Sequence, residues 1–285
     1  MHTLLLSCLL LASPDAIPQG KSTIDLPFEK VTLRLYAYKP ANFQNGPMLM
    51  VFHGILRNAE EYRDHAVEMG DRFGALIICP LFEEKIFPIP KYQFGGIVDD
   101  EGHAVPAKDR TGEYVNRIAK EIRRREGRAD MPYALIGHSG GGQFLGRLAA
   151  FVQTDAQRIV VSNPSSYTLP TDKQPFPFGF GGLPAELQND EVYKAYLGQP
   201  VTLYVGSKDI VRDEYFDASK LAEVQGDTRF ARAKYAYEFA KNIAQEKGWP
   251  FNWKLLIAEG IEHDHEKMFN SPDCAIALGW KPKEK

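Results

Sequence analysis

Short apolar runs recur along the chain, and most of them are continuous rather than alternating. A continuous apolar strand is expected where helices cover both faces of a sheet. The runs that predict such strands are Met48–Phe52, Ala75–Cys79, Tyr133–Gly137, Arg158–Ser162, Val201–Val205 and Trp253–Ala258. An earlier run, Val31–Tyr38, alternates apolar and polar residues, which suits an outer antiparallel strand with one exposed face.

Amphipathic helical patterns lie between these strands. They cover Glu113–Arg125, Gln143–Val152 and Phe230–Lys247, each with an apolar stripe at helical spacing. Strands that alternate with helices imply parallel βαβ units with right-handed crossovers. The expected fold is α/β: a doubly wound, mostly parallel sheet with helices on both faces and no separate large cap domain. Because no repeat or linker divides the chain, residues 21–285 are predicted to form a single catalytic domain.

The N-terminus has a different character, and residues 1–16 are predicted to be a signal peptide. The apolar run from Leu4 to Leu11 is too short to span a bilayer and suits the core of such a peptide, although no Lys or Arg precedes it. We therefore expect an exported protein, periplasmic or extracellular, whose mature chain begins near Ile17 to Lys21.

Charge and cysteine content limit the expected partners. A formal net charge of −3 gives no electrostatic reason to expect nucleic acid or an anionic membrane. No other segment is long and apolar enough to cross a membrane. Beyond the leader, Cys79 and Cys274 could form one disulfide, but two buried free thiols are favoured, and their spacing fits no zinc motif. The oligomeric state stays open.

The pentapeptide Gly137-His138-Ser139-Gly140-Gly141 joins an apolar strand directly to an amphipathic helix. A serine hydroxyl is a poor nucleophile unless it is exposed, oriented and served by a base. A sharp strand–turn–helix exposes the central serine, and flanking glycines leave room for the turn. Ser139 is therefore the predicted nucleophile, and the Gly140 N–H is predicted to donate to an oxyanion.

A dinucleotide-binding loop is the competing interpretation of these glycines. Gly140, Gly142 and Gly146 nearly match Gly-x-Gly-x-x-Gly, but the third glycine falls one residue late. No acidic residue closes the next strand, where a ribose partner is expected. The nucleophile turn is favoured.

A second oxyanion donor is expected after the Met48–Phe52 strand, which runs into His53-Gly54. The backbone N–H of Ile55 is the first candidate and that of Leu56 the second. His53 is predicted to hold the loop, with the role of catalytic base as a minor alternative.

The acid and the base are expected after later strands, in the chain order Ser…Asp…His. Asp209 follows Val201–Val205 most closely, and Asp213 and Asp217 are later alternatives. After the last strand, His263 is favoured over His265 because it lies nearer to the strand end. A metal site on His263-Asp264-His265 is an alternative interpretation, but the sequence shows no second cluster of ligands, so no metal site is predicted.

Two long stretches, 80–106 and 163–200, do not fit the alternation and are rich in Pro, Gly and aromatic residues. Such segments are often functional loops or lids, and the alternative is ordinary surface loops with some buried aromatics. From the second stretch, Tyr167, Phe176 and Phe178 are the predicted substrate-binding residues, and with Phe180 they could line an apolar pocket.

These motifs together resemble the α/β-hydrolase superfamily. Within it, the chain is similar to secreted serine esterases of the polyhydroxybutyrate-depolymerase-like and feruloyl-esterase-like kind. The finer likeness rests on Leu56–Asp64, Gln225–Phe230 and Gly260–Met268, and the resemblance spans Leu33 to Phe269.

The resemblance implies a function for each matched position. Ser139 matches the nucleophile, Asp209 the acid and His263 the base, while Gly140 and Ile55 match the oxyanion donors. The cation of Lys208, next to the acid, is expected to face solvent.

The sequence thus predicts a serine hydrolase that cleaves carboxylic esters of small or oligomeric substrates through an acyl-enzyme, with no cofactor. The alternatives are a thioesterase, peptidase or acyltransferase with the same triad, or a catalytically silent binding protein on this fold.

Overall fold

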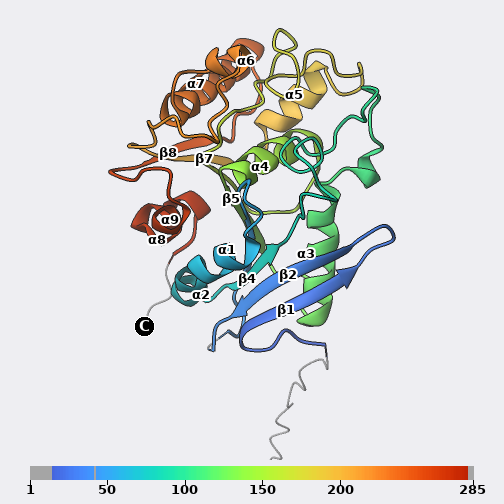
Figure 1. Ribbon diagram of the computed structural model, residues 1–285, viewed down its shortest axis with the longest axis vertical. Helices are drawn as coiled ribbons and strands as arrows, with labels where there is room; N and C mark the ends of the chain where they lie inside the picture. The colour runs from blue at the N-terminus through green and yellow to red at the C-terminus, as the bar shows by residue number, and fades with distance from the viewer. Residues whose placement is uncertain (1–14, 42, 282–285) are drawn as a thin grey trace, which may run out of the picture.

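The computed structural model describes residues 15–41 and 43–281, and it contains one eight-stranded sheet (Figure 1). The strands are β1 (Gly20–Pro27), β2 (Thr32–Lys39), β3 (Met48–Phe52), β4 (Leu76–Pro80), β5 (Tyr133–His138), β6 (Ile159–Ser162), β7 (Val201–Gly206) and β8 (Lys254–Ala258). Their order is β1-β2-β4-β3-β5-β6-β7-β8, antiparallel from β1 to β4 and parallel from β4 onward. The expected doubly wound, mostly parallel sheet is confirmed.

Helices cover both faces of this sheet. The described helices are α1 (Ala59–His65), α2 (Val67–Phe73), α3 (Glu113–Arg125), α4 (Gly140–Phe151), α5 (Asp190–Leu197), α6 (Lys220–Glu223), α7 (Arg229–Lys247), α8 (His265–Asn270) and α9 (Pro272–Leu278), with a 3₁₀ turn at Ala107–Asp109. One side of the sheet carries α1, α2, α8 and α9, and the other carries α3, α4, α5 and α7 (Figure 1).

The side chains of successive strand residues pack alternately into two separate hydrophobic cores. On β3, Met48, Met50 and Phe52 pack with α3, α4, α5 and α7, whereas Leu49 and Val51 pack with α1, α2, α8 and α9. Side chains of a strand alternate between the faces of a sheet, so a strand covered on both sides must be apolar throughout. This explains the continuous apolar runs of the sequence.

The structure adds elements that the periodicity did not predict. β1 pairs with β2 over its whole length at the edge of the sheet. Its alternation is hard to recognise because Gly20 and Ser22 precede the two buried apolar residues, Ile24 and Leu26, on its inner face. α4 begins at Gly140 rather than Gln143, because three glycines hide the start of the helical pattern. Most of the expected signal peptide, residues 1–14, lies outside the described residues.

Two sequence expectations concern the chain as a whole. Cys79 and Cys274 are both buried and free, as favoured above. Within residues 15–41 and 43–281, no helix combines the length and apolarity needed to span a bilayer.

Candidate active site

The carboxyl ends of five parallel strands meet at one edge of the sheet. Phe52 of β3 pairs with Gly137 of β5, and His138 of β5 pairs with Ser162 of β6. β6 and β7 run in register, and Gly206 pairs with Ala258 at the ends of β7 and β8. The loops that follow these strands therefore emerge side by side, which is where α/β folds place their sites.

Ser139 forms the turn between β5 and α4 with φ 56° and ψ −117°, a conformation that non-glycine residues rarely adopt. Its neighbours leave no room for side chains. A Cβ on Gly137 would lie 2.4 Å from the Gly141 carbonyl oxygen, and a Cβ on Gly141 would lie 2.2 Å from that of Phe52. The flanking glycines are thus required by the close approach of β5, α4 and β3, as the motif predicted.

The N-terminus of α4 has no side-chain cap from Ser139, although serine is a favoured capping residue. Ser219 and Ser271 both cap the helices that follow them. The Ser139 hydroxyl is therefore not committed to the helix, and the first N–H groups of α4 stay without that partner. These N–H groups lie at the positive end of the helix dipole.

The loop after β3 brings Ile55 to the same place. A Cβ built on Gly140 would lie 3.1 Å from the Ile55 backbone nitrogen, so the two predicted oxyanion donors are immediate neighbours. Gly54, one residue earlier, lies against the Ser139 side chain, since a Cβ there would be 3.7 Å from the Ser139 Cβ. Leu56, the second candidate, is an exposed residue of the pocket rim.

Asp209 lies after β7 and is almost completely buried. Its Oδ2 atom is 2.8 Å from His263 Nδ1 and accepts a hydrogen bond of 2.5 Å from Asn163 Nδ2. An ionised carboxylate only accepts hydrogen bonds, so His263 Nδ1 carries the proton of this bond. The other ring nitrogen, Nε2, is then the basic one. Lys208, beside the acid, is exposed, as expected.

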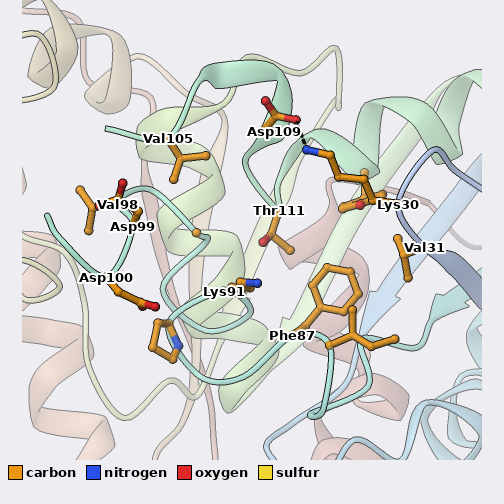
Figure 2. Close-up of a pocket in the computed structure, with 14 residues that line it drawn as sticks. Lys30, Val31, Phe87, Lys91, Val98, Asp99, Asp100, Val105, Asp109 and Thr111 are labelled. Carbon is orange, nitrogen blue, oxygen red and sulfur yellow. Dashed lines mark hydrogen bonds and ion pairs between the residues drawn. The ribbon is translucent and has the colours of Figure 1, made fainter. Parts of the chain in front are cut away.

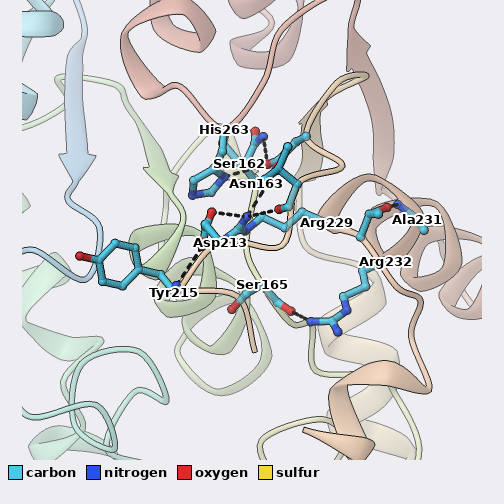
Figure 3. A network of polar contacts seen from close by, with 12 residues as sticks. Ser162, Asn163, Ser165, Asp213, Tyr215, Arg229, Ala231, Arg232 and His263 are labelled. Carbon is cyan, nitrogen blue, oxygen red and sulfur yellow. Dashed lines mark hydrogen bonds and ion pairs between the residues drawn. The ribbon is translucent and has the colours of Figure 1, made fainter. Parts of the chain in front are cut away.

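A buried arginine, Arg229, lies beside the acid Asp209 and pairs with Asp213, as Figure 3 shows for the second of these carboxylates. Arg229 has a fully buried side chain whose Nη1 is 3.5 Å from Asp209 Oδ1 and 2.8 Å from Asp213 Oδ2. Burial acts to raise the pKa of Asp213, but the Arg229 guanidinium outweighs it and holds that pKa below its usual value. Asp213, an alternative acid in the sequence, is thus the partner of Arg229, and Asp209 is the partner of His263.

His53 is fully buried within the loop after β3 and away from the acid. Its Nδ1 is 2.9 Å from the Gly54 carbonyl oxygen, and its Nε2 accepts a hydrogen bond from the Phe82 N–H. Burial lowers the pKa of His53 to about 3, so the ring stays neutral and keeps both bonds. These contacts hold the loop after β3 in place, as expected of a structural histidine.

His265 does not reach the acid. Its Nε2 lies 2.8 Å from His65 Nδ1, and its ring stacks on Tyr62 with centroids 4.0 Å apart. Burial, followed by the charge on His65, lowers the pKa of His265 to about 4. Of the two histidines after β8, His263 is the one that is paired with Asp209.

A pocket of about 230 Å³ opens between these groups. Ser139, His263 and Ile55 line it, and the exposed side chains of Leu56 and Tyr215 form part of its rim. Within the described chain, no hydrogen bond joins the Ser139 hydroxyl to either imidazole, and catalytic bonds of this kind often tighten only when substrate binds.

The predicted substrate-binding aromatics are not brought to this pocket. Tyr167 and Phe178 are buried, and Phe176 packs against the same core with its ring 5.9 Å from that of Phe151. In the described residues, the aromatic side chains of the pocket are those of Tyr62 and Tyr215, with His138, His263 and His265. The aromatic side chains of the loop after β6 pack against the core, because a long irregular segment needs apolar contacts to become ordered.

A larger cavity of about 480 Å³ lies elsewhere, between the β1–β2 turn and the segment 86–111 (Figure 2). Its described walls include Phe87 and the ion pair between Lys30 and Asp109, at 3.3 Å. The described walls hold no Ser, Cys or His, so the serine–histidine chemistry that the sequence predicts belongs to the smaller pocket.

Sequence reasoning missed two residues of the site, Asn163 and Arg229. Asn163 follows β6 directly and has φ 48°, and a polar residue at a parallel strand end could have drawn attention to it. Arg229 starts α7, twenty residues after Asp209, and no local pattern links the two.

Solved structures of other proteins share the fold of this chain. A poly(3-hydroxybutyrate) depolymerase from Bordetella parapertussis has 30% identity and a TM-score of 0.85, over 93% of each chain. Poly(aspartic acid) hydrolase-1 from Sphingomonas sp. KT-1 has 26% identity and a TM-score of 0.84, over 92% of this chain and 98% of that one. An esterase from Pyrobaculum calidifontis shares the fold alone, with 13% identity and a TM-score of 0.50 over 92% of this chain and 83% of that one.

No protein-family model and no curated protein sequence matches the chain. The depolymerase from Bordetella parapertussis nevertheless matches 93% of the chain, and its identity of 30% shows common descent. The chain therefore belongs to the α/β-hydrolase superfamily and stands among its poly(3-hydroxybutyrate)-depolymerase-like hydrolases.

Proposed function

We propose that the protein hydrolyses carboxylic esters through an acyl-enzyme on Ser139. The observation that carries the proposal is the bond of 2.8 Å between the buried Asp209 and His263, whose imidazole lines the same pocket as the strained Ser139 turn. Nucleophile, base and acid then follow the order and strand positions of a Ser–Asp–His triad.

In the first step, His263 Nε2 takes the Ser139 proton while the hydroxyl oxygen attacks the ester carbonyl. The N–H groups of Ile55 and Gly140 stabilise the charge that develops on the carbonyl oxygen. The C–O bond to the alcohol then breaks, and the imidazolium gives its proton to the departing oxygen.

In the second step, water replaces the alcohol. His263 deprotonates the water, which attacks the acyl carbon, and Ser139 leaves with the proton that His263 returns to it. Asp209 keeps the imidazole in the required tautomer and stabilises its charged form, and Asn163 and Arg229 fix the carboxylate.

The size of the pocket favours short acyl groups. About 230 Å³ is below the usual range of roughly 300–1,000 Å³ for sites that enclose drug-sized ligands. Phe176 and Phe178 do not line the Ser139 pocket, because Phe178 is buried and Phe176 packs on the core, so they offer no extension of it for a long acyl chain. One relative is named for an ester-linked polymer and the other for poly(aspartic acid), so amides are the second class to test.

The test compares Ser139→Ala, Asp209→Asn and His263→Ala in p-nitrophenyl acetate hydrolysis. Each change should lower kcat/KM by roughly 10⁴-fold or more, since triad members act as a unit. His103→Ala, which removes an exposed imidazole outside the pocket, is the matched control and should keep wild-type activity. Near-wild-type rates in Ser139→Ala or His263→Ala would contradict the assignment.

Two further measurements separate the alternatives. A fluorophosphonate should label the wild type at Ser139, and a folded wild type that resists labelling would favour a catalytically silent scaffold. A series of matched acetyl, butyryl and decanoyl esters, thioesters and anilides should show the highest kcat/KM for short-chain esters. A preference for the anilides would point instead to amide hydrolysis.

A further inference from the structure

Three side chains with metal-binding atoms meet at the wall of the Ser139 pocket. Glu61 and His65 lie four residues apart on α1, hence on one face of the helix, and His265 is the first residue of α8. One ligand atom of each lies within 4.8 Å of the other two. His65 Nδ1 and His265 Nε2 are 2.8 Å apart, and His265 Nε2 is 3.9 Å from Glu61 Oε1.

The surrounding residues already orient the two imidazoles. The His265 ring stacks on Tyr62, with centroids 4.0 Å apart, and also lies against His65, with centroids 4.8 Å apart. On its other nitrogen, His65 Nε2 lies 3.6 Å from Glu266 Oε2. A carboxylate behind a histidine is the outer-shell arrangement that fixes ring orientation and raises ligand basicity in metal sites.

The set remains open to an ion from solvent. The side chains of Glu61, His65 and His265 are 51%, 27% and 17% exposed. Two imidazoles and one carboxylate match the protein ligands of zinc sites that keep a fourth position open. A hydrogen bond between two imidazoles uses a single proton, and an ion that replaces this proton would bind both nitrogens.

We propose that Glu61, His65 and His265 form a binding site for a divalent transition-metal ion, with Zn²⁺ as the best match. Glu61 and His265 also line the Ser139 pocket, so an ion bound by them would lie at the wall of the space that an ester would occupy. The sequence offered a metal site on His263, Asp264 and His265 only as a disfavoured alternative, whereas the structure brings Glu61 and His65 of α1 to His265.

Equilibrium binding tests the site without reference to hydrolysis. The tag-free, metal-stripped chain is titrated with Zn²⁺ against a chromogenic chelator, and the wild type should bind one ion. His65→Ala, His265→Ala and Glu61→Gln should each weaken this binding, the histidine variants by about 100-fold or more and the outer-shell Glu266→Gln by roughly 10-fold. His103→Ala, which also removes one exposed histidine, should bind as the wild type does.

Two outcomes would overturn the proposal: a wild type that does not bind Zn²⁺, or an affinity that His65→Ala and Glu61→Gln leave unchanged. Glu61 is an exposed side chain, so Glu61→Gln tests the site even if a histidine variant fails to fold. Ser139→Ala should bind Zn²⁺ with wild-type affinity, so failure of the proposed ester hydrolysis and failure of this site are told apart.

The effect of Zn²⁺ on ester hydrolysis tests whether the ion binds at the wall of the Ser139 pocket. Saturating Zn²⁺ should lower kcat/KM for p-nitrophenyl acetate in the wild type, and the ratio of rates with and without Zn²⁺ should return toward one in Glu61→Gln. Equal inhibition of both proteins would place the inhibiting ion on other ligands, such as His263. An ion that binds without inhibition would contradict its placement in the pocket wall.

Discussion

At the scale of single residues, the site depends on how closely α4 approaches the loop after β3. Ser139 occupies a backbone region that costs about 1–3 kcal/mol for a non-glycine residue. Surrounding contacts sustain this strain, because the neighbouring glycines let three backbone segments touch. Gly140 has the tightest link to function, since a Cβ there would lie 3.1 Å from the Ile55 nitrogen.

Gly140→Ala is expected to lower kcat with less effect on KM. The added methyl group would push the Ile55 N–H away from the position of the oxyanion, and removal of one such donor costs about 100- to 1,000-fold, so a loss of roughly 10-fold or more is expected for displacement. Gly146→Ala, on the same helix with nothing within 4 Å of its Cβ, is the matched control. It should keep activity and raise stability by about 0.5–1 kcal/mol. Equal activities of the two variants in steady-state kinetics would contradict this role for Gly140.

At the scale of elements, two helix N-termini serve the site in different ways. α4 leaves its first N–H groups without a cap from Ser139, whereas α7 is capped by Thr228, whose hydroxyl accepts a hydrogen bond of 3.0 Å from the Ala231 N–H. The start of α7 also binds the acid segment, because the Phe230 N–H donates to the Asp209 carbonyl and Arg229 reaches its carboxylate. The cap therefore holds the helix end that supports Asp209.

Thr228→Ala is expected to lower the free energy of unfolding by about 1 kcal/mol, the usual effect of losing a capping hydroxyl. Thr228→Ser keeps the hydroxyl and should retain most of the wild-type stability. Urea unfolding of the three proteins measures the difference, and a Thr228→Ala protein as stable as the wild type would show that the cap contributes nothing.

At the scale of the whole molecule, the buried His53 and His138 and the partly buried His265 link stability to pH, because they stay neutral in the folded protein. Burial lowers the pKa of His53 to about 3, that of His265 to about 4 and that of His138 well below its ordinary value. In the unfolded chain each would titrate near pH 6.5. Between about pH 6.5 and 4 the unfolded chain therefore binds more protons than the folded one, and stability falls as the pH falls.

The free energy of unfolding should decrease by about 1.4 kcal/mol per pH unit for each of these histidines, or roughly 4 kcal/mol per unit together, once the pH is well below 6.5. Urea unfolding at pH 6 and pH 5, with chelator present, measures the slope above the range in which most carboxylates titrate. His138→Gln, which removes one buried imidazole, should reduce the slope by about 1.4 kcal/mol per unit. An unchanged slope in this variant would show that His138 is protonated in the folded protein.

Much of the architecture was predictable because it rests on local patterns. The continuous runs on β3 to β7 need only the alternation of side chains between two covered faces, and Ser139 was recognisable because its turn is encoded by five consecutive residues. β1 was missed because an edge strand buries only a few residues of one face.

What the sequence determined by itself was the parallel strands, three of the helices that cover them and the residues at each strand end, since periodicity and turn chemistry act over a few residues. Only the tertiary structure decided which of two histidines, two residues apart, meets Asp209, and that Arg229 lies behind this acid. It also buried Tyr167 and brought His265 to α1. These outcomes depend on how long loops pack, and such packing is the sum of many weak contacts between distant parts of the chain, which no local pattern encodes.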